Sequence, residues 1–173
     1  MARLPYADEN TDPETAALAQ RIRDERGGRL LNLYRMLLNS PPIAEGWLNL
    51  LTAVRQKSHL SARYREMAII RVALLNGADY EYKAHIPFAV EAGLTLGQIE
   101  SLASWTSATE CDEVDRAVLA YVDSMTRDIQ VPDAIFDNVA QCFNDRELTE
   151  LTTTIAAYNM VSRFLQALRV NPE

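Results

Sequence analysis

Apolar side chains recur at intervals of three and four residues along most of this chain. After Ser40, for example, Ile43, Trp47, Leu51 and Val54 are spaced to lie on one face of an α-helix. No segment of four to eight residues alternates apolar and polar side chains in the manner of a half-buried strand. The pattern therefore predicts an all-α fold of seven or eight helices.

Two consecutive helices are marked most clearly by their end signals. Ser61 can cap a helix that runs through Asn76, and Gly77 supplies the stop. Asp79 is then placed to cap a second helix, which ends at Gly93. Because the connection is so short, we expect the two helices to pack as a central antiparallel hairpin.

The same spacing and end signals predict the other helices, and we expect residues 1–173 to form a single domain. Residues 1–12 show no apolar period and are expected to form an extended arm that packs on a neighbouring subunit. Thr95 and Gln98 fit a capping box. The remaining predicted helices cover approximately 13–28, 29–39, 95–104, 113–128, 132–143 and 147–170.

Composition and charge exclude several classes of function. A formal net charge of −7 leaves no basic stripe for nucleic acid, and an anionic membrane surface is disfavoured for the same reason. The chain has no apolar run long enough to span a membrane and no signal peptide pattern, so we expect a cytoplasmic protein. The only two cysteines, Cys111 and Cys142, are far apart and are expected to be reduced and structural.

Glu66 is a carboxylate on an apolar helix face. It lies three, four and seven residues before Ile69, Ile70 and Ala73. An ionised carboxylate without partners costs several kcal/mol to bury, so such a group is usually paired, hydrogen-bonded or protonated. Each of these states suits an acid/base site.

Glu81 and His85 lie one turn apart in the next predicted helix, on a face that continues through Phe88 and Ala89. A carboxylate beside an imidazole can fix its tautomer and tune it to transfer protons near neutral pH. Pro87 removes a backbone donor beside this pair, and we expect it to kink the helix and open the site. Trp47, Tyr80 and Tyr82 are candidates for the lining of a substrate pocket.

Three other readings of these residues stay open. The spacing of Glu81 and His85 is also common on exposed helix surfaces. A buried polar network of Glu66, Glu81 and His85 could serve only to fix helix packing in a non-catalytic ligand-binding protein. A carboxylate and histidine metal site would need ligands from a second subunit, because His59 is the only other histidine; we expect no metal and no cofactor.

Three segments resemble the superfamily of carboxymuconolactone decarboxylase and the alkylhydroperoxidase AhpD. They are LSARYREMAIIRVA from Leu60, YEYKAH from Tyr80 and AGLTLGQI from Ala92. The resemblance is best over about residues 30–102. It implies an all-helical domain that assembles as a homo-oligomer, usually a trimer or hexamer.

The peroxidase branch of this superfamily carries Cys-x-x-Cys with a histidine four residues after the second cysteine and a glutamate nineteen residues before that histidine. Glu66 and His85 match this motif, whereas Ala78 and Glu81 occupy the two cysteine positions. The thiolate that attacks a peroxide and the thiol that resolves it are both missing. The sequence resembles the cysteine-less, decarboxylase-like branch better.

The resemblance implies a cofactor-free carboxy-lyase that acts on a small lactone or keto acid. His85 would exchange a proton with the substrate, Glu81 would orient His85, and Glu66 would relay protons. An AhpD-like peroxidase is the alternative within the superfamily. An anionic substrate would be repelled by two carboxylates unless one is protonated or an arginine compensates, and Arg63, Arg71 and Arg163 are not placed by the sequence.

Overall fold

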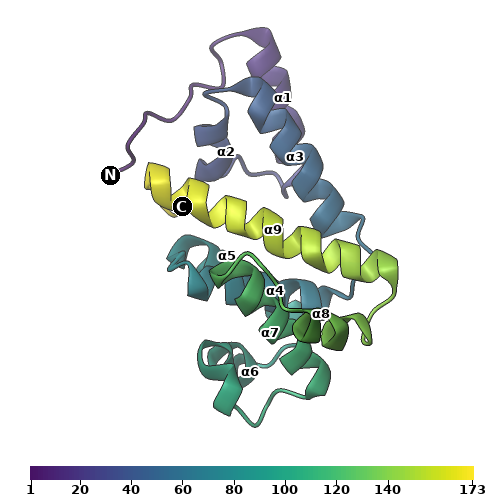
Figure 1. Cartoon of the computed structure of the whole chain (residues 1–173). Coiled ribbons are helices and arrows are strands. Elements are labelled where there is room, and N and C mark those ends of the chain that lie inside the picture. The colour runs from purple at the N-terminus through teal and green to yellow at the C-terminus, as the bar shows by residue number, and fades with distance from the viewer. The chain divides into compact units, whose positions relative to one another are not determined.

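The computed structural model describes residues 1–173 and consists of helices and their connections (Figure 1). It has nine α-helices and one 3-10 helix, which corrects the expected number of seven or eight. The predicted segments nevertheless correspond to all nine α-helices, including the short α2 (Asn32–Leu37) and α6 (Leu96–Ser101), and the 3-10 helix η1 (Leu102–Ser107) follows α6 directly. The all-α class is confirmed.

The chain divides into two compact units. Unit 1 comprises residues 1–57 and 164–173, and unit 2 comprises residues 58–163. The long helix α9 (Asp145–Leu168) belongs to unit 2 as far as Arg163 and ends in unit 1. No helix is both long and apolar enough to cross a membrane.

Unit 1 is built around α1 (Pro13–Glu25) and α3 (Pro41–Gln56), which pack against each other. Ala19 and Ile22 on α1 and Ala44 and Leu48 on α3 are completely buried. Each helix begins with proline at its first turn, where the missing N–H would have no helical partner. The apolar spacing read from the sequence therefore corresponds to a real helix interface.

The N-terminal arm packs on unit 1 of its own chain. The Arg3 backbone N–H donates to the Leu168 carbonyl at 2.9 Å, and the Ala7 N–H donates to the Arg35 carbonyl at 3.0 Å. The Tyr6 ring lies 5.1 Å from the Arg35 guanidinium carbon. Residues 1–12 are thus part of the unit 1 surface.

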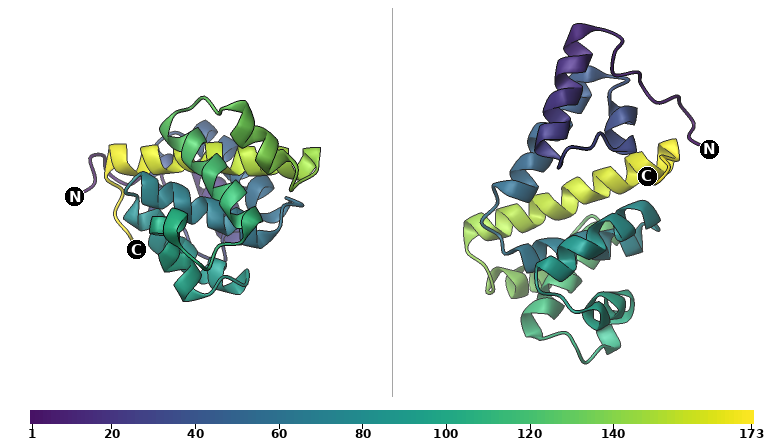
Figure 2. Two further views of the ribbon diagram at one scale, coloured as in Figure 1. Left: turned by 60° about the horizontal axis from the view of Figure 1, so that its bottom comes forward. Right: turned by 180° about the vertical axis from the view of Figure 1, so that it is seen from behind.

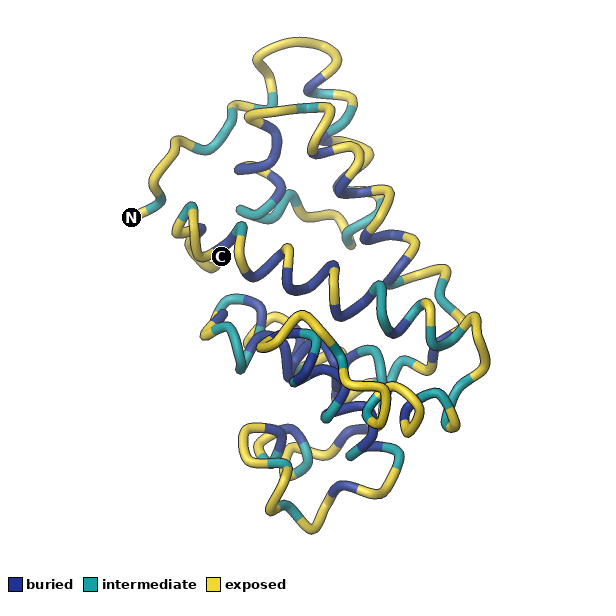
Figure 3. Tube along the Cα trace, in the orientation of Figure 1, coloured by how far each residue is buried: buried dark blue, intermediate teal, exposed yellow.

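Unit 2 contains the predicted hairpin, formed by α4 (Ala62–Leu75) and α5 (Asp79–Glu91), which lie side by side in Figures 1 and 2. Gly77 adopts φ +61° in the turn, a conformation that disfavours other residues. The helix α7 (Glu113–Arg127) packs against α4 and also against α8 (Asp133–Ala140). Because α4 contacts both α5 and α7, all residues from 66 to 73 are buried (Figure 3).

The helix ends agree with most of the sequence signals. Thr95 and Gln98 form the expected capping box at the start of α6. Ser40 and Ser61 occupy N-cap positions, although neither side chain makes a capping hydrogen bond. Asp79 is the first residue of α5 rather than its cap, which is Ala78. The helix α5 continues through Pro87 to Glu91.

Candidate active site

Glu66 and His85 form a buried hydrogen-bonded pair across the α4–α5 hairpin. Oε2 of Glu66 lies 2.7 Å from Nδ1 of His85. Glu66 is 2% exposed and His85 is 6% exposed, so the bond lies in a region with little access for water. The short turn at Gly77 brings these residues together although they are 19 positions apart in the chain. The sequence correctly predicted that Glu66 lies within reach of His85.

The second carboxylate oxygen of Glu66 contacts a cation. Arg65 Nε lies 3.3 Å from Glu66 Oε1, and the arginine side chain is 15% exposed. A cation beside a carboxylate stabilises its ionised form and reduces the negative charge that a substrate meets. Arg65 therefore offsets part of the negative charge of Glu66.

Two aromatic rings flank the imidazole of His85. Its centroid lies 5.1 Å from that of Tyr158 in an edge-to-face arrangement, and 5.7 Å from that of Phe88 at a tilted angle. Tyr158 is buried on α9, whereas Phe88 is 43% exposed on α5. Edge-to-face ring contacts restrict the orientation of an imidazole in the same way as they restrict other aromatic rings.

Glu81 does not pair with His85 as the sequence suggested; its hydrogen-bond partner is Ser162 on α9. Ser162 Oγ lies 2.5 Å from Glu81 Oε2, whereas Glu81 Oε1 is buried without a hydrogen-bond partner. Glu81 is 2% exposed. Burial raises the pKa of Glu81, and the Ser162 hydrogen bond lowers it by less, so that the resulting pKa is about 8.

The two contacts between α5 and α9 show how these helices run. Glu81 precedes His85 on α5, and their partners follow in the opposite order on α9, as Ser162 and then Tyr158. The helices are therefore antiparallel here. Ser162 and Tyr158 are one helical turn apart, and the Ser162 hydroxyl also lies 2.8 Å from the Tyr158 carbonyl oxygen.

The roles of the two glutamates thus differ from the sequence prediction. Glu66, expected to relay protons, is the carboxylate that contacts Nδ1 of His85. Glu81, expected to orient His85, is held by α9 instead. An i, i+4 spacing permits a contact between side chains, but the stronger partners came from other helices.

The candidate pocket residues are distributed between the two units. Tyr80 and Tyr82 lie on α5 in unit 2 and are partly exposed. Trp47 lies on α3 in unit 1, where its ring centroid is 5.2 Å from that of Phe164. Its buried Nε1 has no hydrogen-bond partner. A role in substrate binding stays a prediction for all three residues.

The three arginines considered from the sequence have partners of their own. Arg71 is buried and makes two hydrogen bonds to Asp123, at 2.6 and 2.7 Å. Arg63 pairs with Asp115 at 2.6 Å. Arg163 donates to the side-chain oxygen of Asn159 at 2.7 Å. These pairings support the helix packing of unit 2.

Neither cysteine belongs to this cluster. Cys111 is a free thiol just before α7, and Cys142 is a free thiol just after α8. Burial raises the pKa of Cys111, and the negative charge of Asp115 raises it further. No group of three or more potential metal ligands occurs in the structure.

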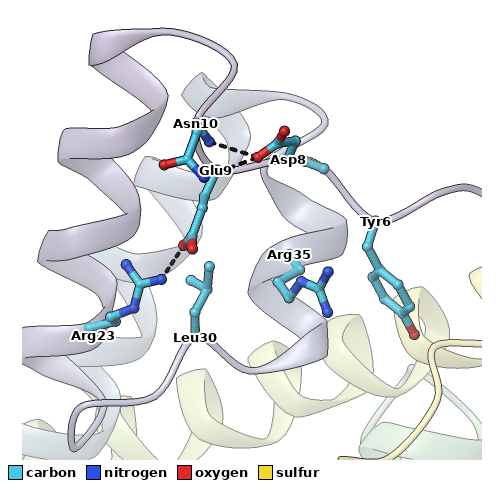
Figure 4. A pocket seen from close by; sticks show the side chains of 8 residues that line it. Tyr6, Asp8, Glu9, Asn10, Arg23, Leu30 and Arg35 are labelled. Atoms are coloured by element: carbon cyan, nitrogen blue, oxygen red, sulfur yellow. Dashed lines mark hydrogen bonds and ion pairs between the residues drawn. The ribbon is translucent and has the colours of Figure 1, made fainter.

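A cavity of about 460 Å³ lies in unit 1 beside the N-terminal arm (Figure 4). Its lining includes arm residues 6–10, Arg23, Leu30 and Arg35. Glu9 forms an ion pair with Arg23, and Asp8 accepts hydrogen bonds from Asn10. The Glu9–Arg23 ion pair joins the arm to α1, and the Asp8–Asn10 hydrogen bonds lie within the arm. None of the predicted site residues lines the cavity.

Sequence reasoning missed Ser162 and left Tyr158 without a role. The available signal was the position of Ser162 on a buried face of α9, between Tyr158 and Leu165 and in line with Ile155. A serine among apolar residues suggests a buried hydrogen-bond partner. The identity of that partner, 81 residues away, depends on tertiary packing.

Comparisons with known proteins show what this chain is similar to. The model of the carboxymuconolactone decarboxylase (CMD) family matches residues 41–124. A protein of unknown function from Agrobacterium tumefaciens, named as a candidate antioxidant defence protein AhpD, is 26% identical. That match covers 78% of this chain and 93% of the other, with a TM-score of 0.73. The comparison with curated proteins gave no match.

More distant structures share the fold. An uncharacterised peroxidase-related protein with an AhpD core, from Ralstonia eutropha JMP134, has a TM-score of 0.84 at 18% identity; 99% of this chain and 92% of the other are covered. A cysteine-to-alanine variant of the debrominase Bmp8, solved with 2,3,4-tribromopyrrole, has a TM-score of 0.82 at 15% identity, with 100% and 94% covered. The CMD match and the AhpD-like neighbour from Agrobacterium tumefaciens support the resemblance to the carboxymuconolactone decarboxylase and AhpD-like superfamily, and the more distant structures share its fold.

Proposed function

We propose that this protein is a cofactor-free acid/base enzyme of the carboxymuconolactone decarboxylase type, acting on a small lactone or keto acid with His85 in proton transfer. The observation that carries the proposal is the buried 2.7 Å contact between His85 Nδ1 and Glu66 Oε2. A carboxylate in this position both fixes the tautomer of an imidazole and stabilises its protonated form.

The Glu66 contact supports a specific role for each of the two ring nitrogens of His85. With the Nδ1 hydrogen donated to Glu66, the lone pair of the neutral ring lies on Nε2. Nε2 is then the atom that takes up a proton and later delivers it to the substrate. Glu66 acts through His85 and is a positioning residue in this scheme.

The reaction that fits is decarboxylation next to a conjugated carbonyl group. The bond between carbon and the carboxylate group breaks, carbon dioxide leaves, and the electron pair moves into the carbonyl system to give an enolate. Protonated His85 delivers its Nε2 proton to the carbanionic carbon and becomes neutral. A proton from water restores the imidazolium, so each carbon dioxide released consumes one proton.

The charges of the site are compatible with an anionic substrate. Arg65 lies beside Glu66, and burial raises the pKa of Glu81 to about 8, which favours the neutral form of that carboxyl group. The cluster therefore carries fewer negative charges than its two glutamates suggest. This removes the main electrostatic objection to a carboxylate substrate.

A thiol-dependent peroxidase is the other enzymatic reading, because structural relatives are named for AhpD. Ala78 and Glu81 occupy the positions of the two motif cysteines, and burial raises the pKa of Cys111. A peroxidase of this type needs an accessible thiolate, so the chemistry favours proton transfer. We also propose that the protein assembles as a trimer or hexamer, as the resemblance to the superfamily implies.

The test is a screen of small lactone acids and keto acids for release of carbon dioxide. We expect turnover of at least one compound, and His85→Ala should lower it by at least roughly 10²-fold with the helical content unchanged. His59→Ala is the matched control, because His59 is exposed and is the only other histidine. Equal turnover by the His85 variant would refute the proposal, and no turnover of any compound would favour a non-catalytic binding protein.

A further inference from the structure

Glu81 has one carboxyl oxygen with a partner and one without. Oε2 lies 2.5 Å from Ser162 Oγ, whereas Oε1 is buried and has no hydrogen-bond partner. Buried polar atoms in native proteins are nearly always satisfied. The Oε1 atom of Glu81 therefore keeps an unused hydrogen-bonding position inside the candidate active site.

The contacts of Glu81 decide which protonation state this pocket suits. An ionised carboxylate has two oxygens that both require donors, and here a single hydroxyl serves one of them. Burying such an anion costs several kcal/mol. A neutral acid needs fewer donors: when Oε2 accepts the Ser162 hydrogen as the carbonyl oxygen, Oε1 is the oxygen left to carry the acid hydrogen.

Ser162 is well placed to set this arrangement. The single hydrogen of its hydroxyl is shared between Glu81 Oε2 at 2.5 Å and the Tyr158 carbonyl oxygen at 2.8 Å one turn earlier, and Ser162 is completely buried. The other titratable groups of the site are Glu66 on α4, His85 on α5 and Tyr158 on α9, and Glu66 is engaged by His85 and Arg65. Burial of Glu81 raises its pKa to about 8, in agreement with the hydrogen-bond geometry.

We propose that Glu81 is a neutral carboxylic acid whose Oε1–H donates a hydrogen bond to the carbonyl oxygen of a small anionic substrate, and that Ser162 is the residue that positions it. The inference rests on the proposed function and deepens it by naming a required feature of the substrate. When carbon dioxide leaves, negative charge develops on the carbonyl oxygen, where Oε1–H stabilises it while His85 protonates the carbon. A carboxylic acid without such an oxygen is not a substrate.

The protonation state can be measured without any substrate, by a carbon-13 NMR titration of the glutamate side-chain carboxyl groups in the intact protein. The Glu81 signal is assigned from its loss in Glu81→Gln. We expect it to report a neutral acid at pH 7, with a midpoint of about 8. Ser162→Ala should move the midpoint upward by about one pH unit, because a hydrogen bond to the ionised form is lost.

Two further variants separate this effect from a general change in packing. Thr154 is also buried on α9, and its hydroxyl bonds the Glu150 carbonyl at 2.7 Å. Thr154→Val should leave the Glu81 midpoint unchanged, and Ser162→Thr, which keeps a hydroxyl, should restore it. A wild-type midpoint near 4.5, the ordinary value for glutamate, would overturn the inference.

The failure of this inference is distinguishable from the failure of the proposed function. If Glu81 titrates near 4.5 while His85→Ala still abolishes turnover, the acid/base enzyme stands and the neutral acid does not. If Glu81 titrates near 8 and no lactone or keto acid is turned over, the neutral acid stands without the decarboxylase. With a substrate in hand, Ser162→Ala should shift the pH profile of turnover in parallel with the NMR midpoint.

Discussion

Oε2 of Glu66 lies 2.7 Å from Nδ1 of His85, and this contact joins the two helices of the central hairpin inside a buried site. Replacement of Glu66 by glutamine keeps the size of the side chain but removes the charge that stabilises protonated His85. We expect Glu66→Gln to lower turnover by at least about 10-fold with the fold intact. Steady-state kinetics test this, with Glu100→Gln on the exposed face of α6 as the control. Equal effects of the two variants would contradict an orienting role for Glu66.

The buried acid Glu81 should make stability depend on pH. The pKa of Glu81 is about 8 in the folded protein, whereas the ordinary value of 4.5 applies to the unfolded chain. The folded state therefore binds this proton more tightly than the unfolded state does. Its contribution to the free energy of unfolding is complete below about 4.5 and is lost as the pH rises through 8. Relative to Glu81→Gln, the wild type should lose at most about 5 kcal/mol over this range. Urea unfolding at a series of pH values measures the difference, and parallel curves would contradict a buried neutral acid.

Glu150 should show the opposite dependence on pH. Its Oε2 accepts from the Ser58 hydroxyl and from the His59 and Leu60 N–H groups at 2.7–2.9 Å, which fixes the segment before α4. Desolvation raises the pKa of Glu150, but these hydrogen bonds outweigh it and lower the pKa to about 2. The stabilisation is present above about 4.5 and is lost as the pH falls through 2.

Glu150→Gln is therefore expected to lower the free energy of unfolding by about 1–3 kcal/mol at neutral pH. The difference from wild type should shrink as the pH falls through 2, because Glu150 is protonated in both the folded and the unfolded state only below that pH. Denaturant unfolding at neutral and acidic pH tests this expectation. A difference that is the same at both pH values would show that the charge of Glu150 is not responsible.

The two cysteines should not support peroxide chemistry. Cys111 is 8% exposed, and its pKa is raised by burial and by Asp115, so little thiolate forms at neutral pH. We expect consumption of hydroperoxide in the presence of a thiol reductant to equal the rate without enzyme, and Cys111→Ser to change nothing. Peroxide turnover that disappears after alkylation of the thiols would restore the peroxidase reading.

Helix end signals and apolar spacing in the sequence predicted the helices that carry the site residues. The stop at Gly77, the capping box at Thr95 and the apolar face around Glu66 depend on neighbouring residues, and the structure has all three. The Glu66–His85 contact could be predicted as well, because a short turn leaves few ways to pack two successive helices.

The partner of Glu81 could not be predicted in this way. Ser162 lies 81 residues further along the chain, and its place beside Glu81 depends on how α9 packs against the hairpin. Helix spacing alone favoured a contact between Glu81 and His85, because both lie on one face of α5. Tertiary contacts from α4 and α9 provided other partners for both residues. Local patterns also describe helix boundaries imprecisely: the segment predicted over 29–39 contains the six-residue helix α2.

The most direct test of His85 as a proton-transfer residue is hydrogen–deuterium exchange at carbon. Small keto acids and lactone acids are incubated with the protein in deuterium oxide, and proton NMR follows the hydrogens next to the carbonyl group. The account predicts that wild type and His59→Ala introduce deuterium into at least one compound, and that His85→Ala does so at least roughly 10²-fold more slowly. Exchange at the same rate in the His85 variant, or no exchange by the wild type in any compound, would contradict it.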